Sequence, residues 1–155
     1  MTSTVDLQCV INANAQFWEQ MLAMTLEAMP PAEGFCLGAG HVMGIVRMSG
    51  VWKGRIEVRM AGGLAYTATA AMMMQAPDTV VEADVLDATK EIANMIAGTI
   101  KSSLPRPCSM TVPEAVMNGE GFCRRAKGDD TLEVVFRHAA GEMMVRVVEL
   151  ECAGA

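Results

Sequence analysis

The segment from residue 81 to residue 103 constrains the fold most, because it combines the period of an α-helix with two very different sides. An α-helix advances about 100° per residue, so residues three, four and seven positions apart lie on one side. One side is nearly all apolar and is expected to face a core: Val81, Val85, Ala88, Ile92, Met95 and Thr99. The other side contains Asp84, Asp87, Glu91, Asn94 and Gly98. The sequence therefore predicts a helix that is anchored on one side and presents polar side chains on the other.

Gly98 lies inside this predicted helix, where a glycine costs about 1 kcal/mol relative to alanine. Close approach by another molecule is one reason for a glycine at such a position. We therefore interpret Glu91 and Asn94, which lie one helical turn apart and next to Gly98, as the candidate functional residues. Without this context, a Glu-x-x-Asn pattern also occurs on solvated helix faces that have no function.

The composition is that of a globular chain and excludes several classes of function. The chain has 155 residues, of which 52% are hydrophobic and 19% charged, so we expect one domain over residues 1–155 with a single core. The net charge of −6, without a cluster of lysine and arginine, argues against a nucleic-acid-binding surface. No apolar run reaches the roughly 18 residues of a membrane span. The N-terminus has no signal-peptide pattern, so a cytoplasmic location is expected.

The five cysteines, with only two histidines beside them, indicate neither a zinc site nor a disulfide framework. Their number is odd, and no C-x-x-C spacing occurs. We therefore expect reduced and mostly buried thiols. His41 and His138 fall at the edges of predicted strands and are interpreted as solvated or structural residues.

The order of the predicted elements indicates an α+β fold in which helices pack on an antiparallel sheet. Helices are expected at residues 12–29 and 64–75, in addition to the 81–103 helix. Alternating residues predict a hairpin over residues 41–60, with its turn at Gly50 and a wet face formed by Lys53, Arg55, Glu57 and Arg59. Further strands are predicted at residues 109–111, 119–125, 131–138 and 143–151. This order suggests two pseudo-repeated helix–strand halves.

Three consecutive methionines, Met72, Met73 and Met74, lie near the end of the 64–75 helix. Methionine adapts to irregular gaps, so filling of the core is the leading interpretation. A surface that binds a partner is the alternative, because exposed methionines adapt to the shape of what they contact.

The string Glu91-Ile-Ala-Asn94-Met-Ile-Ala-Gly98 resembles the signature helix of the CheX/CheC group of chemotaxis phosphatases. The pattern of that group is an Asp or Ser, then Glu-x-x-Asn, then a proline further on. Here Asp87 precedes the pair and Pro113 follows it, somewhat closer to Asn94 than is usual. The segment 49–54, Ser-Gly-Val-Trp-Lys-Gly, also resembles a hairpin of the group. The first predicted helix has no Glu-x-x-Asn, so a single CheX-like domain fits better than the two-site CheC.

The resemblance implies a protein phosphatase that accelerates hydrolysis of the aspartyl phosphate on a CheY-type receiver domain in chemotaxis signalling. In that role Asn94 orients the attacking water and Glu91 fixes the docking register. Asp87 supports the rim of the site, and Gly98 lets the backbone of the partner approach. The resemblance also implies no cofactor on this chain, Mg²⁺ on the partner receiver domain, and a homodimer.

Two other interpretations stay open. The first is a non-catalytic module of the same fold that binds a receiver domain or joins a flagellar switch assembly. The second is an unrelated α+β dimer in which the polar side of the 81–103 helix is merely solvated.

Overall fold

The structure is a computed structural model, and it describes residues 5–29, 35–123 and 131–150. The helices are α1 (Leu7–Leu22), α2 (Gly62–Met73), the 3-10 helix η1 (Pro77–Thr79) and α3 (Glu82–Lys101). The strands are β1 (Glu27–Met29), β2 (Cys36–Leu37), β3 (His41–Gly50), β4 (Gly54–Met60), β5 (Cys108–Met110), β6 (Glu114–Asn118), β7 (Phe122–Cys123), β8 (Thr131–His138) and β9 (Gly141–Glu149). The described residues contain no helix that combines the length and the apolar composition of a membrane span.

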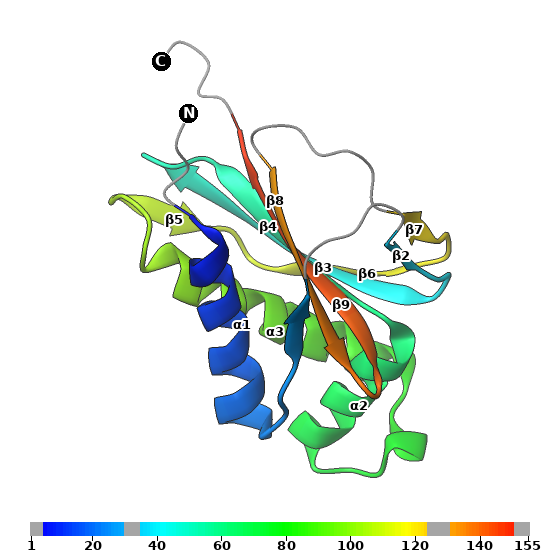
Figure 1. Cartoon of the computed structure of the whole chain (residues 1–155). Helices are drawn as coiled ribbons and strands as arrows, with labels where there is room; N and C mark the ends of the chain where they lie inside the picture. The colour runs from blue at the N-terminus through cyan, green and yellow to red at the C-terminus, as the bar shows by residue number, and fades with distance from the viewer. Residues whose placement is uncertain (1–4, 30–34, 124–130, 151–155) are drawn as a thin grey trace.

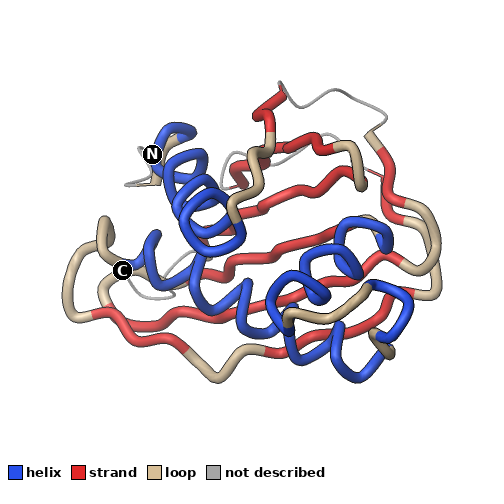
Figure 2. Tube along the Cα trace, turned by 90° about the horizontal axis from the view of Figure 1, so that it is seen from below, coloured by secondary structure: helices blue, strands red, loops and turns tan. Residues whose placement is uncertain are grey.

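Within the described residues, seven strands form one antiparallel sheet, and the three α-helices lie together on one of its faces (Figures 1 and 2). The strand order is β1-β8-β9-β4-β3, and the long strand β3 then pairs with β5 near one end and with β6 near the other. Strands β2 and β7 form a separate antiparallel pair. The α+β fold with helices on an antiparallel sheet is therefore confirmed, whereas the two pseudo-repeated halves stay a prediction.

Strand alternation places an apolar face of the sheet under the helices. In β4 the side chains of Ile56, Val58 and Met60 are fully buried. Their partners across the ladder on β9 are also buried and apolar: Val147, Val145 and Met143. The buried side of α3 packs against this face over β3 and β4, so one continuous core holds the helix that contains the candidate residues.

The hairpin predicted for residues 41–60 is present as β3 and β4. Gly50 ends β3 with a φ of +129°, a conformation that glycine adopts without strain. A Cβ atom at Gly50 would also collide with the backbone carbonyl oxygen of Pro107. Glycine is therefore required at this turn both by its backbone conformation and by the segment that leads into β5.

The first helix differs from the prediction at both ends. The sequence predicts a helix over residues 12–29, but α1 begins at Leu7, because Asp6 Oδ1 accepts a hydrogen bond from the backbone N–H of Cys9 at 2.8 Å. The helix ends at Leu22, and Ala23 follows it in the left-handed conformation. Residues 27–29, predicted as the last helical turn, form β1 and pair with β8.

The C-terminal strands agree with the prediction in part. Strand β8 has the predicted bounds, and β9 begins two residues before the predicted strand. Strand β6 is not predicted, because the expected strand at 119–125 begins only after β6 has ended. Residues 122 and 123 of that expected strand form β7, and residues 124 and 125 lie outside the described residues.

The face of the sheet opposite the helices contains a buried charged cluster. Glu57 is only 4% exposed, and one of its carboxylate oxygens lies 2.6 Å from Arg55 Nε. Its other oxygen lies 3.5 Å from Arg59 Nη2 and 3.7 Å from Arg146 Nη1. The prediction of a wet face is therefore wrong at Glu57, because guanidinium groups replace the water that its carboxylate would otherwise need.

Cys36 is disulfide-bonded, so the expectation of reduced thiols is wrong for this residue. Its backbone lies opposite that of Cys123 in the β2–β7 pair. The half-buried Cys9 and the buried Cys108 are free thiols, as expected. A missing C-x-x-C pattern excludes common metal and redox motifs, but it does not exclude a single disulfide between distant segments.

Candidate functional site

The residues predicted to be functional lie on the outward side of α3. Asp87 and Glu91 are exposed, and Asn94 and Gly98 are half-buried. The other side of the helix is buried: Val85, Ala88, Thr89, Ile92, Ala93, Ile96, Ala97 and Ile100. The predicted core-facing side is confirmed for Val85, Ala88 and Ile92. It is wrong for Val81, which is exposed at the cap of the helix, and Met95 and Thr99 are only half-buried.

The first turn of α3 is held by Asp84. Its Oδ2 accepts a hydrogen bond from the backbone N–H of Val81 at 3.2 Å, and its own N–H donates to the Val81 carbonyl at 3.0 Å. The hydroxyl of Thr79, which precedes the helix by three residues, donates to the Ala76 carbonyl oxygen and does not cap the helix. A carboxylate at this end also interacts favourably with the helix dipole. The start of the helix, and hence the direction in which Glu91 and Asn94 point, is thereby defined.

The sheet brings α3 close through Gly44 on β3. Gly44 has no side chain, and Thr89 and Ala93 of α3 lie directly over it. Large side chains at this contact would push the helix away from the sheet. The candidate residues on the far side of α3 are therefore presented by a helix whose distance from the sheet is set by small residues.

Gly98 is not needed for packing within the described chain. A Cβ atom built on Gly98 meets no atom within 4 Å. Alanine at this position would improve helix propensity by about 1 kcal/mol, so the fold itself gains nothing from the glycine. The space over Gly98 is open, and the approach of another molecule there stays a prediction.

The side chains of Glu91 and Asn94 are available to a partner. Among the described residues, neither side chain makes a hydrogen bond or an ion pair. A carboxamide donates and accepts hydrogen bonds without carrying charge, so Asn94 is suited to orient a water molecule beside an anion. Within the described ranges, no group of three or more His, Cys, Asp or Glu residues is placed to hold a metal ion.

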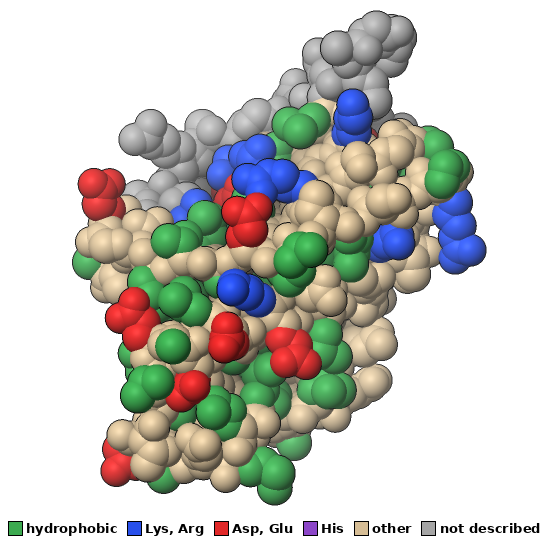
Figure 3. All heavy atoms as spheres, turned by 180° about the vertical axis from the view of Figure 1, so that it is seen from behind, with side chains coloured by type: hydrophobic (Ala, Val, Ile, Leu, Met, Phe, Trp, Pro, Cys, Tyr) green, Lys and Arg blue, Asp and Glu red, His purple; other side chains and the backbone are tan. Residues whose placement is uncertain are grey.

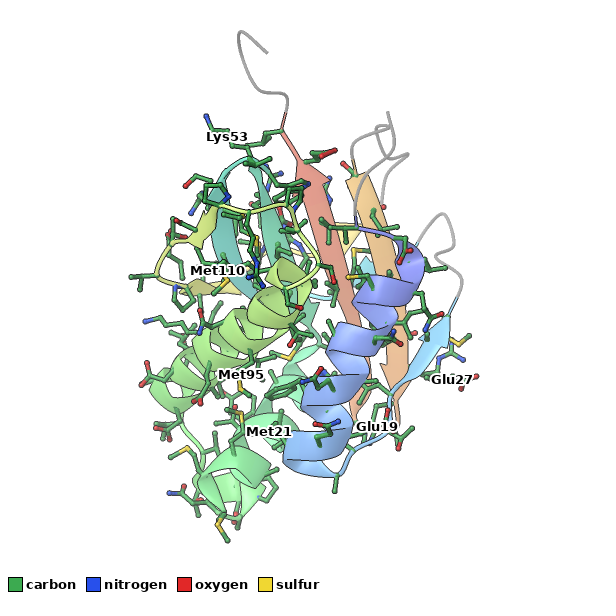
Figure 4. The ribbon with its side chains drawn as sticks, turned by 90° about the vertical axis from the view of Figure 1, so that its left-hand side faces the viewer. Glu19, Met21, Glu27, Lys53, Met95 and Met110 are labelled. Atoms are coloured by element: carbon green, nitrogen blue, oxygen red, sulfur yellow. The ribbon has the colours of Figure 1, made fainter. Side chains whose placement is uncertain are left out.

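A hollow of about 560 Å³ lies beside Glu91, between α3 and the ends of α1 and α2. We refer to it as the methionine hollow; its lining comprises Phe17, Met21, Leu22, Ala71, Met72, Met73, Met74, Asp84, Asp87, Ala88, Glu91 and Met95. Figure 4 shows Met21 of α1 and Met95 of α3 in the space between these two helices. Sequence reasoning missed this site, because residues from three separate helices form it.

The methionine run at the end of α2 does not serve mainly to fill the core. Met72 is partly buried against the core, but Met73 is 38% exposed and Met74 is 92% exposed. Core filling, the leading interpretation from sequence, is therefore wrong for Met73 and Met74. Both residues line the methionine hollow.

A second hollow of about 410 Å³ lies at the other end of α3 and has the opposite charge. Gly98, Lys101 and Arg106 line it together with Ser102 and Cys108. The two hollows beside α3 are therefore lined by opposite charges, carboxylates in the hollow near its first turns and cations in the hollow near its last turn. Asn94 lies between these two regions.

The chain matches a family model described as "Chemotaxis phosphatase CheX" over residues 42–137, a range that includes all of α3. A comparison with curated protein sequences found no match.

Solved structures of chemotaxis and flagellar proteins share the fold. The chemotaxis protein CheX from Vibrio vulnificus has a TM-score of 0.77 at 20% identity, over 97% of this chain and 100% of that chain. A chain in the CheX–CheY–BeF3–Mg²⁺ complex from Borrelia burgdorferi has a TM-score of 0.74 at 20% identity, over 96% and 100%. FliY from Thermotoga maritima has a TM-score of 0.61 at 12% identity, over 90% and 84%. At such identities these structures establish a common fold.

Proposed function

Because the chain belongs to the CheX family of chemotaxis phosphatases, we propose that it accelerates hydrolysis of the aspartyl phosphate on a CheY-type receiver domain. The Borrelia burgdorferi relative forms a complex with CheY, BeF3 and Mg²⁺, which supports a receiver as the partner. The observation in this chain that supports the proposal best is the pair Glu91 and Asn94. Both side chains lie on the outward side of a helix packed on the sheet, and neither is engaged by another described residue.

In this proposal Asn94 orients the attacking water in line with the phosphorus atom. A receiver domain already has Mg²⁺ and a lysine beside its phosphoryl group, so a phosphatase needs to add little more than a positioned water. The carboxamide of Asn94 hydrogen-bonds that water and, being neutral, does not repel the phosphate. The metal belongs to the receiver, and the proposal uses no nucleophile or cofactor on this chain.

The neighbours of Asn94 on α3 fix the position of the receiver. Glu91 pairs with the receiver lysine and sets the docking register. Asp87 supports the rim one turn earlier, and Gly98 leaves the space that the receiver backbone occupies. Because water must be positioned closely for attack, an error of about 1 Å in docking can cost about 100-fold in rate.

We further propose that the active species is a homodimer of this single domain. The alternative function is a non-catalytic module that binds a receiver or associates with the flagellar switch. The observation that favours this alternative is the similarity of the fold to FliY, at 12% identity. The two functions differ in one property, which is whether the bound receiver loses its phosphate faster.

The deciding experiment measures phosphate loss from CheY-type receiver domains of the same genome, charged with acetyl phosphate. We expect the wild type to accelerate this loss and Asn94→Ala to lower the rate constant at saturating receiver by at least about 100-fold. Binding of Asn94→Ala to a receiver loaded with BeF3 should persist. Glu91→Gln should instead weaken binding by about tenfold or more, because it removes one partner of a charge pair.

Two matched variants control this experiment. Asn12→Ala removes an exposed carboxamide from α1, where Asn12 Oδ1 accepts a hydrogen bond from Gln8 at 2.8 Å, and should keep the wild-type rate. Glu82→Gln removes an exposed carboxylate from the first turn of α3 and should keep wild-type affinity. Wild-type turnover in Asn94→Ala would refute the mechanism. Binding without any acceleration by the wild type would establish the non-catalytic alternative.

A further inference from the structure

We infer that the methionine hollow is a second contact site for the docked receiver, and that it takes an apolar side chain of the receiver flanked by lysine or arginine. This inference rests on the proposed function, because the same docked partner occupies both sites. Glu91 and Asp87 belong to the outward side of α3 and also line the hollow. A partner that contacts Glu91 therefore lies directly beside the opening of the hollow.

Several of the apolar side chains that line the hollow are exposed to solvent. Met21 is 57% exposed on α1, and Met73 and Met74 at the end of α2 are 38% and 92% exposed. Clusters of exposed apolar side chains on a soluble surface mark contact sites, and flexible methionines adapt to the side chain that enters. The volume of about 560 Å³ is ample for one large apolar side chain with its neighbours.

The charged residues that line the hollow indicate which residues flank the apolar side chain of the receiver. Three carboxylates line the hollow, from Asp84, Asp87 and Glu91, whereas no lysine or arginine is among its lining residues. The cations Lys101 and Arg106 line the separate hollow near the last turn of α3. On the face of the molecule shown in Figure 3, most acidic side chains likewise lie in the lower half and most basic ones in the upper half. A receiver segment with a basic residue next to an apolar one matches the methionine hollow.

The same charges argue against a second copy of this chain as the occupant. In a two-fold symmetric dimer the same patch of each subunit meets its counterpart. Such an interface across the methionine hollow would bring six carboxylates together, three from each copy, since Asp84, Asp87 and Glu91 line each hollow. Like charges placed together in this way are unfavourable. A basic segment of a different protein avoids this repulsion.

The test uses the double variant Met21→Ser/Met73→Ser, with Val112→Ser as the control. Val112 is also an exposed apolar residue, but it lies between β5 and β6, outside the hollow. We expect the double variant to bind BeF3-loaded receiver at least about tenfold more weakly, since each anchor in such a pocket commonly contributes a factor of this size. Its dephosphorylation rate constant at saturating receiver should stay at the wild-type value, and Val112→Ser should match the wild type in both quantities.

A second arm tests the charges. Asp87→Asn should weaken binding and reduce its dependence on salt concentration, whereas Glu82→Gln on the same helix should change neither. Circular dichroism and urea unfolding check that every variant is folded.

Three results separate the possible failures. Unchanged receiver affinity in the double variant, together with loss of turnover in Asn94→Ala, would overturn the inference and leave the proposed function intact. Wild-type turnover in Asn94→Ala would refute the proposed function instead. A change in oligomeric mass of the double variant by light scattering, with receiver affinity unchanged, would assign the hollow to contact between copies and overturn the inference.

Discussion

A Cβ atom built on Gly44 of β3 would lie 2.9 Å from the Cβ of Ala93 in α3, closer than two carbon atoms pack in proteins. It would also lie 3.1 Å from the Cγ2 and from the backbone carbonyl oxygen of Thr89. The sheet and the helix therefore meet at a point that tolerates no added methyl group. Ala93 is the neighbour of Asn94 in the chain, so this contact acts directly on the position of the proposed catalytic side chain.

Gly44→Ala is expected to lower the free energy of unfolding by about 1–3 kcal/mol, because the methyl group forces α3 away from β3. Urea denaturation followed by circular dichroism measures this loss. Gly38→Ala is the matched control, because a Cβ atom on Gly38 meets nothing within 4 Å. Equal stability of the two variants would show that the contact between β3 and α3 is looser than the structure describes.

Gly98→Ala is expected to have opposite effects on stability and on function. The methyl group enters open space, and alanine is the better helix former, so the variant should be more stable by up to about 1 kcal/mol. If the receiver backbone approaches at Gly98, affinity for BeF3-loaded receiver should fall at the same time. Stability comes from urea denaturation and affinity from titration calorimetry. A more stable variant with wild-type affinity would remove Gly98 from the proposed docking surface.

His41 is a buried structural residue, which is one of the two interpretations suggested by its sequence position. It is 1% exposed, with Nδ1 3.0 Å from the Gly38 carbonyl oxygen and Nε2 3.0 Å from Arg59 Nη1. Because arginine can only donate, Nε2 accepts this hydrogen bond and Nδ1 holds the proton. Burial lowers the pKa of His41, the hydrogen bond to Gly38 opposes this in part, and the positive charge of Arg59 lowers the pKa further.

The lowered pKa of His41 predicts that mild acid destabilises the fold. The unfolded chain, in which the imidazole has its ordinary pKa of 6.5, binds the proton more tightly than the folded chain. The contribution of His41 is therefore fully present above pH 6.5, and it decreases as the pH falls from 6.5 toward the lower folded-state pKa. Urea unfolding between pH 5 and pH 8 should show a smaller pH slope for His41→Asn than for wild type.

A matched variant makes the pH experiment specific. His138→Asn removes the other histidine of the chain, whose Nδ1 accepts a hydrogen bond from the backbone N–H of Ala140 at 3.0 Å. Identical pH slopes for wild type and His41→Asn would contradict the assignment of the acid sensitivity to His41.

Local sequence patterns predicted those parts of the fold that depend on the residues of a single helix or strand. The two sides of α3 follow from the 3.6-residue period of residues 84–98, and β8 from the alternation of Leu132, Val134 and Phe136. The end of α1 was predicted seven residues too late, because an apolar helical pattern continues past Leu22. Pairing of residues 27–29 with β8, more than 100 residues away, decides that this segment is a strand.

The candidate site also has one part that the sequence predicted and one part that only the structure revealed. Asp87, Glu91, Asn94 and Gly98 share one side of a single helix, and a helical period places them together without reference to the rest of the chain. The methionine hollow had no comparable signal, because Met21 and Met73 reach it from α1 and α2. The burial of Glu57 also had no signal in the local sequence, because one of its partners, Arg146, comes from β9, the strand next to β4.

The sequence by itself therefore determined which residues of α3 face outward, that this helix has an apolar side, and that an antiparallel sheet lies beneath it. The two sides of the helix depend on residues within about 20 positions of one another, whose relative directions the backbone period sets. The sheet was expected from the order of the predicted elements along the chain. Only the tertiary structure decided that Gly44 meets Ala93, that Glu57 is buried among arginines, and that exposed methionines gather beside Glu91. Those contacts join segments distant in sequence, and their positions depend on strand order, register and helix packing, which no local pattern specifies.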